Sequence, residues 1–313
     1  MSKEKVYTKF NSYRKPKFNL RTEVSIENGK KNVYKTSVYE EGEEFIQHIY
    51  NSYKELSKLE LPFEINKCEL VDKRTLRFEY IEGKSLLKEI EEIAMSNDLD
   101  KFVNKFKEFE ELLNKLPSKK DKLGKEFEEV FGSYEEDKEY DLLLPGILDL
   151  NLDNIIRDKD GTLHLIDYEW CFDFAIPKRY VLYRTVYYSL LYLGSFKTKK
   201  WNLKNLEKEL GLTEKEIKKY FKWENDFQKY VTNREGDYIK TFDSRLQIND
   251  NPFKQETLLT NKITYDENLN KYKIEISRLE DAKKKDITQK QILKDVHNLP
   301  EEEIQKIMLL FTI

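Results

Sequence analysis

The sequence predicts an α+β fold with two lobes, a small antiparallel sheet that carries one helix and then a mostly helical lobe. Two β-rich runs, FNLRTEVSI and KNVYKTSV, are separated by an Asn-Gly turn signal. A helical pattern and two further strand-like runs follow them. Helical patterns dominate from residue 84 onward. We therefore expect a first lobe over residues 1–83, a helical lobe over 84–250, and a C-terminal appendage of unknown role over 251–313.

The first lobe is expected to start with a β-hairpin. Asn28 and Gly29 fall at its turn, where both central residues need a positive φ that Asn and Gly adopt readily. Phe45 and Ile49 belong to an apolar repeat at helical spacing, so EEFIQHIYNSYKELSKL is expected to be a helix. The runs NKCELV and TLRFEYI, joined by DKR, complete the sheet as two more strands.

The second lobe should contain several amphipathic helices. SLLKEIEEIAM and LDKFVNKFKEFEELLNKL each carry an apolar stripe, and KEFEEVF is expected to form a short helix. The segment around DKDG predicts a short hairpin. YVLYRTVYYSLLYL is expected to be a buried core helix rather than a surface for substrate.

Composition narrows the class of protein. The chain has 56 Lys and Arg against 59 Asp and Glu, a net charge of -3, which argues against a dedicated binder of nucleic acid or anionic membranes. Cys68 and Cys171 belong to no metal-binding pattern and are expected to be reduced. The N-terminus lacks a signal-peptide core, and no run approaches the ~20 apolar residues that cross a bilayer. We therefore expect a cytoplasmic protein with no nucleic-acid partner and no membrane insertion.

One stretch, DLNLDNIIRDKDGTLHLIDYEW, fits two metal-binding patterns. Asp149, Asn151 and Asp153 stand at positions 1, 3 and 5 of a calcium loop. That loop also needs Gly at position 6 and Glu at position 12, where this chain has Asn154 and Asp160. The flanking LLLPGIL and the hairpin pattern do not supply the two helices of such a site. The calcium interpretation is therefore rejected.

The same stretch fits a phosphoryl-transfer site better. Asp149 lies five residues before Asn154, the spacing of a catalytic base and a magnesium ligand. The expected hairpin then leads to Asp167, a second magnesium ligand. Magnesium prefers oxygen ligands, and ATP supplies several of them, so the protein needs to give only one or two. The structural alternative is that these are turn-forming and strand-end residues.

A lysine and an acidic partner are expected upstream. Lys35 lies on the strand that follows the hairpin turn, where it would contact the α- and β-phosphates and pair with a helix Glu. Glu40, Glu43 and Glu44 are the candidates, and we favour Glu44 because it adjoins the apolar stripe of the helix.

LRFEYIEGKSL then fits the connection between the lobes. There the backbone near Glu79 and Ile81 would bind adenine.

Lys35, FEYIEG, DLNLDNII and LIDYEW resemble the protein-kinase-like phosphotransferases, in the branch with aminoglycoside and choline kinases. The run DLNLDNII…DG…LIDYEWCFDFAIP is similar, more narrowly, to kinase-like domains of bacterial cell-surface polysaccharide (O-antigen) enzymes. The resemblance covers roughly residues 20–195. It implies a two-lobed protein-kinase-like fold, ATP and Mg²⁺ as cofactors, Asp149 as catalytic base, Asn154 and Asp167 as metal ligands, and Lys35 as phosphate ligand. Glu169 is left with two roles, reaching a second metal or bracing the loop.

Three departures from that family matter. Ile147 stands where the catalytic loop usually has a His that braces its backbone. The segment expected over the phosphates, NSYRKPKF, is basic rather than glycine-rich and offers Arg14, Lys15 and Lys17. Tyr-Glu follows the second metal-binding Asp in place of Phe-Gly, which speaks against a switching activation loop.

Two functions follow from the resemblance. The first is an ATP- and Mg²⁺-dependent kinase that phosphorylates a hydroxyl of a small molecule or glycan in cell-surface polysaccharide biosynthesis, with polysaccharide-synthesis enzymes as partners. The alternative is a catalytically weak pseudokinase-like scaffold in a glycosyltransferase or methyltransferase assembly.

Overall fold

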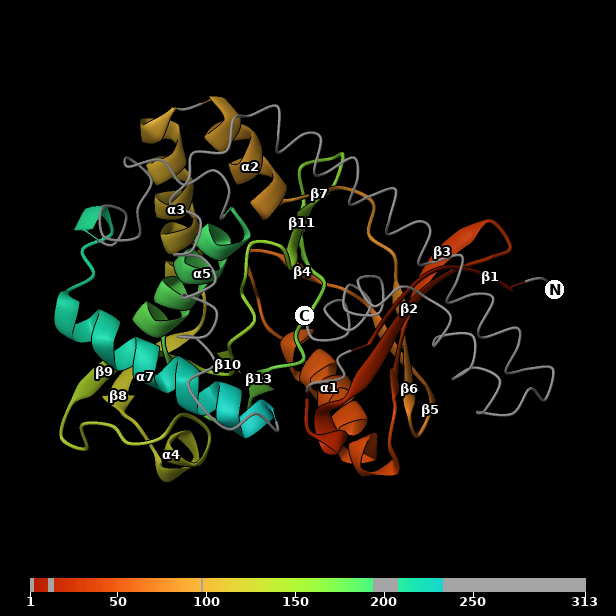
Figure 1. Cartoon of the computed structure of the whole chain (residues 1–313), viewed down its shortest axis with the longest axis horizontal. Coiled ribbons are helices and arrows are strands. Elements are labelled where there is room, and N and C mark those ends of the chain that lie inside the picture. Colours follow the sequence, from red (N-terminus) through yellow and green to blue (C-terminus); the bar gives the residue numbers. More distant parts are fainter. Residues whose placement is uncertain (1–2, 11–13, 97, 194–207, 233–313) are drawn as a thin grey trace, which may run out of the picture. The chain divides into compact units, whose positions relative to one another are not determined.

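The first lobe is built on a five-stranded antiparallel sheet with the order β1-β2-β3-β6-β5 (Figure 1). This computed structural model describes residues 3–10, 14–96, 98–193 and 208–232, all within one unit of the chain, Met1–Phe242. The expected appendage at 251–313 lies outside the described residues. The five strands are β1 Lys3–Phe10, β2 Leu20–Glu27, β3 Lys30–Ser37, β5 Cys68–Asp72 and β6 Thr75–Glu79.

The hairpin between β2 and β3 confirms the prediction from its turn residues. Asn28 and Gly29 have φ values of 53° and 77°, and Glu27 pairs with Lys30 across the turn. β3 is a central strand, with Thr22 on one side of Lys35 and Leu76 on the other. Because both neighbours hold the strand in register, its side chains have fixed directions.

One helix packs on this sheet, as expected. α1 (Glu43–Leu56) follows a short 3₁₀ turn, η2 (Glu40–Gly42), and contacts β3, β5 and β6. Its buried side includes Phe45, Ile46 and Ile49. Burial of these apolar side chains, rather than capping, holds the helix, since Gly42 at its N-cap makes no side-chain hydrogen bond.

A small mixed sheet lies between the first-lobe strands and the helices of the second lobe. Its order is β4-β12-β11-β7, formed by β4 Glu64–Ile65, β12 Leu163–Leu165, β11 Ile155–Arg157 and β7 Lys84–Ser85. The β11–β12 hairpin is the one predicted around DKDG. Gly83 fits tightly against it, because a Cβ there would lie 2.3 Å from the Arg157 carbonyl oxygen.

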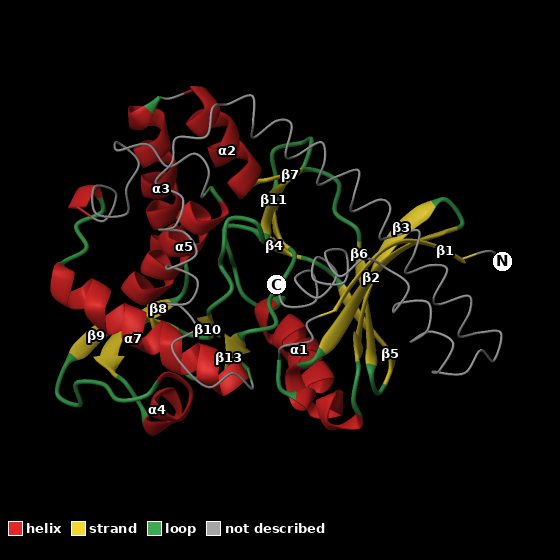
Figure 2. Ribbon diagram, viewed as in Figure 1, coloured by secondary structure: helices red, strands yellow, loops and turns green. Residues whose placement is uncertain are grey.

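The first four helices of the second lobe match the predicted segments closely, whereas the last was not predicted as a separate element. They are α2 Leu86–Ser96, α3 Leu99–Asn114, α4 Lys125–Phe131, α5 Lys178–Tyr192 and α7 Glu214–Val231, and Figure 2 shows α2, α3, α5 and α7 grouped together. α5 is buried along almost its whole length and contacts α3 and α7, which confirms it as a core helix. None of the helices in the described part of the chain has the length and apolar character to cross a membrane.

Two small sheets were not predicted. One has the order β14-β9-β8, with β14 Ile176–Pro177, β9 Glu139–Leu143 and β8 Ser118–Lys122, and the other pairs β10 Gly146–Ile147 with β13 Cys171–Phe172. β8, with the sequence SKKDK, is exposed throughout, so it has no apolar alternation that would mark a strand. Cys68 and Cys171 are both buried and free, as expected.

α7 begins with a capping box that allows a stability test. The Thr213 hydroxyl accepts from the Glu216 amide, and the Glu216 carboxylate accepts from the Thr213 amide. Thr213→Ala removes one of these bonds and is expected to lower the free energy of unfolding by about 1 kcal/mol. Urea denaturation measures this change in the free energy of unfolding. Lys218→Ala, at an exposed position of the same helix, is the control and should change stability by less than about 0.5 kcal/mol.

Candidate functional site

The loop that carries Asp149 connects β10 to β11 and is anchored by alternate leucines. Leu148, Leu150 and Leu152 are all buried in the core. The Leu148 amide donates to the Trp170 carbonyl at 2.9 Å, and the Leu152 carbonyl accepts from the Leu87 amide at 3.0 Å. The leucines therefore fix the polar residues between them. A strand precedes the loop and a strand follows it, so the helix-flanked calcium loop is absent here.

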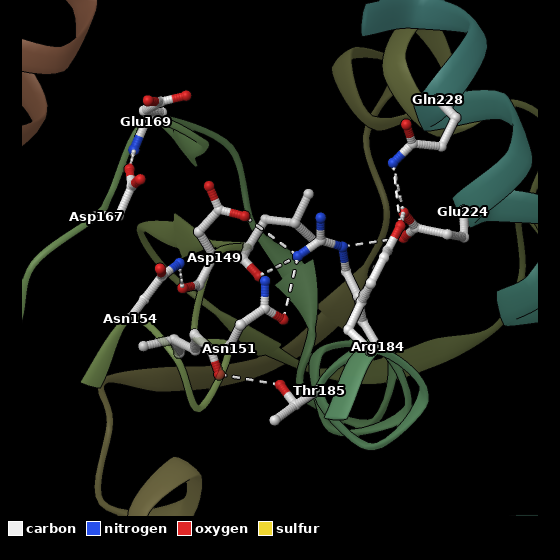
Figure 3. A network of polar contacts seen from close by, with 12 residues as sticks. Asp149, Asn151, Asn154, Asp167, Glu169, Arg184, Thr185, Glu224 and Gln228 are labelled. Atoms are coloured by element: carbon white, nitrogen blue, oxygen red, sulfur yellow. Dashed lines mark hydrogen bonds and ion pairs between the residues drawn. The ribbon is translucent and has the colours of Figure 1, made fainter. Parts of the chain in front are cut away.

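Asn154 is brought beside Asp149, as its spacing predicts. Its Nδ2 donates to the Asp149 carbonyl oxygen at 3.0 Å (Figure 3). Its own carbonyl accepts from the Ile166 amide at 2.9 Å. The second bond ties the loop to the residue just before Asp167. Because Nδ2 is engaged with the backbone, Oδ1 is the side-chain atom left for a metal ion.

Lys35 of the first lobe reaches the acidic end of the β11–β12 hairpin. Its Nζ lies 2.8 Å from Asp167 Oδ2 and 2.5 Å from Glu169 Oε1. The lysine is buried, at 6% exposure. Burial alone would lower the pKa of Lys35, but the charges of Asp167 and Glu169 raise it above its ordinary value. The lysine is therefore a fixed cation beside the carboxylate expected to hold a metal.

Glu169 bridges two cations of the first lobe. Its Oε2 lies 2.6 Å from Arg14 Nη1, while its Oε1 binds Lys35. Burial would raise the pKa of Glu169, but the charges of Lys35 and Arg14 outweigh it and lower the pKa to about 2. The contacts fit a bracing role for Glu169, and its other expected role, reaching a second metal, stays a prediction.

The expected pairing of Lys35 with Glu44 is not the one found. Glu44 is an exposed side chain in the first turn of α1, and no ion pair joins it to Lys35 among the described residues. α1 turns its apolar residues toward the sheet, so this carboxylate lies in solvent. Glu169 and Asp167 hold the lysine instead.

Asp149 is buried near other negative charges. Burial is the main cause that raises its pKa to about 7, and the carboxylates of Asp167 and Glu169 act in the same direction while Arg184 opposes them. Its Oδ1 lies 3.2 Å from Arg184 Nη1. A carboxylate with a pKa near neutrality suits general base chemistry.

The oxygen atoms here fit magnesium bound together with phosphates. Asn154 and Asp167 present an amide and a carboxylate, and Asp167 is partly exposed, with 31% of its side chain accessible. No group of three or more His, Cys, Asp or Glu residues within the described ranges could form a closed protein cage for a metal. Magnesium does not need one, because phosphate and water oxygens complete its octahedron.

The expected adenine segment connects β6 to β7. Asn66 Nδ2 donates to the Glu79 carbonyl oxygen at 3.1 Å, so the protein engages one of the two lone pairs of that acceptor. Ile81 lies in the connection itself and is partly exposed.

Within the described part of the basic segment before β2, residues 14–18, Arg14 reaches the site. Arg14 binds Glu169 and lies over the Trp170 ring, with its Cζ 5.5 Å from the ring centroid. Lys15 and Lys17 lie over the Tyr230 ring instead. Arg14 is therefore the residue of this described segment that reaches the carboxylates of the site, through Glu169.

Arg184 and Glu224 were not predicted from the sequence. Both are buried, at 5% and 1% exposure, and they form an ion pair of 3.0 Å between α5 and α7. The signal was present, because a single Arg within YVLYRTVYYSLLYL is a charge in a core helix and needs a partner there. The identity of that partner does not follow from the pattern.

No protein-family model and no curated protein matches the chain. Among solved structures it is similar to choline kinase LicA from Streptococcus pneumoniae, with 14% identity over 79% of this chain and 92% of that one and a TM-score of 0.44. It is also similar to ADP-bound aminoglycoside phosphotransferase APH(2'')-Ib (14%, 79% and 92%, TM-score 0.37) and to a Plasmodium vivax ethanolamine kinase (13%, 70% and 72%, TM-score 0.33). At these low values the function has to be inferred from the site itself.

Proposed function

We propose that this protein is an ATP- and Mg²⁺-dependent phosphotransferase that transfers a phosphoryl group to a hydroxyl of a small molecule or glycan. One observation carries the proposal. Lys35 from the first lobe forms an ion pair with Asp167, which follows the β11–β12 hairpin. At the start of the same hairpin, Asn154 is hydrogen-bonded to the backbone of Asp149. A cation for phosphates, two oxygen ligands for a metal and a candidate base thus come together from separate parts of the chain.

The chemistry expected of these residues is mainly positioning and electrostatic stabilisation. Asp149 orients the acceptor hydroxyl and accepts its proton. Lys35 balances negative charge on the phosphates, and Asn154 and Asp167 hold the magnesium ion, which neutralises the phosphates when bound. We further propose a cytoplasmic role in cell-surface polysaccharide biosynthesis beside polysaccharide-synthesis enzymes, which the resemblance of DLNLDNII and LIDYEWCFDFAIP supports.

A catalytically weak pseudokinase-like scaffold, which binds nucleotide weakly or not at all, is the second candidate. Ile147 favours it, because this buried residue of β10 pairs with Cys171 of β13 and supplies no bracing imidazole. The two candidates differ in turnover. Incubation with labelled ATP and a panel of sugar and amino-alcohol acceptors should give a phosphorylated product if the first is correct and little or none if the second is.

The metal site can be tested by binding alone. Asp167→Asn is expected to weaken magnesium-dependent ATP binding about tenfold or more, since a charged oxygen ligand is lost. Calorimetric titration with ATP, with and without Mg²⁺, measures this. Asp160→Asn is the control, because this exposed residue lies in the turn of the same hairpin. Unchanged magnesium-dependent binding in Asp167→Asn would contradict the metal site.

A further inference from the structure

Arg184 of α5 binds the loop that carries Asp149. Arg184 Nη1 lies within 3.2 Å of Asp149 Oδ1, 3.3 Å of the Leu148 carbonyl oxygen and 3.5 Å of Asn151 Oδ1 (Figure 3). A single guanidinium nitrogen therefore lies against three oxygens of three neighbouring loop residues. Ile147, just before them, has an apolar side chain and can make no such bond.

The next residue of α5 binds the same loop. Thr185 Oγ1 donates to the Leu150 carbonyl oxygen at 3.0 Å. Arg184 and Thr185 together thus contact all four residues from 148 to 151. Because α5 is buried along almost its whole length, it is a rigid support for these contacts.

Arg184 is itself fixed by Glu224 of α7. Glu224 Oε2 accepts from Arg184 Nε at 3.0 Å and from the Tyr180 hydroxyl at 2.9 Å. Its Oε1 accepts from the Tyr188 hydroxyl at 2.6 Å and from Gln228 Nε2 at 2.9 Å. Four donors converge on one carboxylate that is 1% exposed. A fully bonded buried charge of this kind has one orientation and fixes its partner.

The guanidinium divides its contacts between two carboxylates. Nε faces Glu224, and Nη1 faces the Asp149 loop. Glu224 makes the shorter ion pair, at 3.0 Å against 3.2 Å for Asp149. The geometry therefore supplies orientation to Asp149 without neutralising it in a tight bidentate pair. Orientation is what a base needs most in phosphoryl transfer, where the transition state is loose.

We propose that Arg184, fixed by Glu224, is a positioning residue for Asp149 and does the bracing that Ile147 cannot do. This inference rests on the proposed role of Asp149 in phosphate transfer. A second consequence does not depend on the acceptor. The ion pair between α5 and α7 keeps residues 148–154 of the loop in one conformation.

Hydrogen exchange of the unliganded full chain tests the brace directly. Arg184→Met and Glu224→Gln are expected to speed amide exchange at Leu148 and Asn154 about tenfold or more, because local opening of the loop becomes easier. The matched control is Arg179→Met. Arg179 also lies on α5 and pairs with α7, through Glu216 at 2.7 Å, but away from Asp149. Unchanged loop exchange in Glu224→Gln, or equal acceleration in Arg179→Met, would overturn the inference.

Kinetics supply the second readout. Arg184→Met should lower kcat of ATP turnover by about 10- to 100-fold with KM for ATP nearly unchanged, since a small displacement of a reacting group has effects of that size. Arg184→Lys should recover part of the lost kcat, because it keeps a positive charge. The recovery should be incomplete, because one ammonium group cannot bind Glu224 and the loop at the same time. An inactive wild type would count against the proposed function only, while the exchange data would still decide the brace. If Arg184→Met does not fold, hydrogen exchange and kcat are measured on Arg184→Lys and Glu224→Gln instead.

Discussion

Replacement of Asp149 by Asn is expected to lower phosphate transfer on the order of 10²-fold or more while leaving ATP binding nearly unchanged. The amide has the shape of the carboxylate but cannot accept a proton from the acceptor hydroxyl. The loop should keep its form, because Asn154 binds the backbone oxygen of residue 149 and not its side chain. The Asn side chain keeps an Oδ1 that can accept from Arg184 Nη1, and the variant removes a buried charge that lies near Asp167 and Glu169, so most of the stability should be retained.

Initial rates with saturating ATP and Mg²⁺ measure this effect, and thermal unfolding confirms that the variant is folded. The same chemical change at Asp173, an exposed carboxylate after β13, is the control and should leave the rate unchanged. Wild-type turnover by the Asp149 variant would remove this residue from the mechanism. A parallel loss of ATP binding would instead make it a ligand of the nucleotide complex.

The geometry at the centre of the candidate site could be predicted because it is local. Asp149, Asn154 and Asp167 lie on one loop and one hairpin, and hairpin geometry returns the last of them to the first. Lys35 could be placed because the Asn-Gly turn sets the register of β3. Where residues are joined by a tight turn or by paired strands, their spacing in the sequence determines how close they lie in the structure.

Contacts between distant segments could not be predicted in the same way. Arg14 and Lys35 meet Glu169 across 155 and 134 residues, and Arg184 meets Glu224 across 40. Each of these ion pairs depends on how helices and lobes pack, which no local pattern contains. The choice of Glu44 failed for this reason, since closeness in sequence to an apolar stripe does not place a carboxylate inside the protein.

The missed strands have a related cause. β1 and β8, KEKVYTKF and SKKDK, are rich in charged residues and lack the alternation of a half-buried strand. β1 adds to one side of the first-lobe sheet, and β8 pairs with β9. Such strands form because a neighbouring strand offers backbone partners, so their own composition says little.

Lys35→Met is expected to abolish detectable ATP binding and to lower the free energy of unfolding by roughly 3 kcal/mol or more, because removal of one partner leaves a buried charge uncompensated. Among the cations of the described residues, Glu169 would keep Arg14, and Asp167 would lose Lys35. Urea denaturation and calorimetric titration with MgATP measure the two effects separately. Lys31→Met is the control, since this lysine of the same strand is exposed and its ion pair with Glu82 lies in solvent.

The double variant Lys35→Met/Glu169→Gln separates the structural role of the lysine from its proposed ligand role. Neutralising Glu169 removes the unpaired buried charge, so most of the lost stability should return, as it does when both members of a buried pair are replaced. ATP binding should not return, because no cation then stands at the phosphates. Recovery of both properties would mean that Lys35 only joins the two lobes. If neither returns, Asp167 rather than Glu169 is the carboxylate that depends on the lysine, and Lys35→Met/Asp167→Asn should then restore the stability.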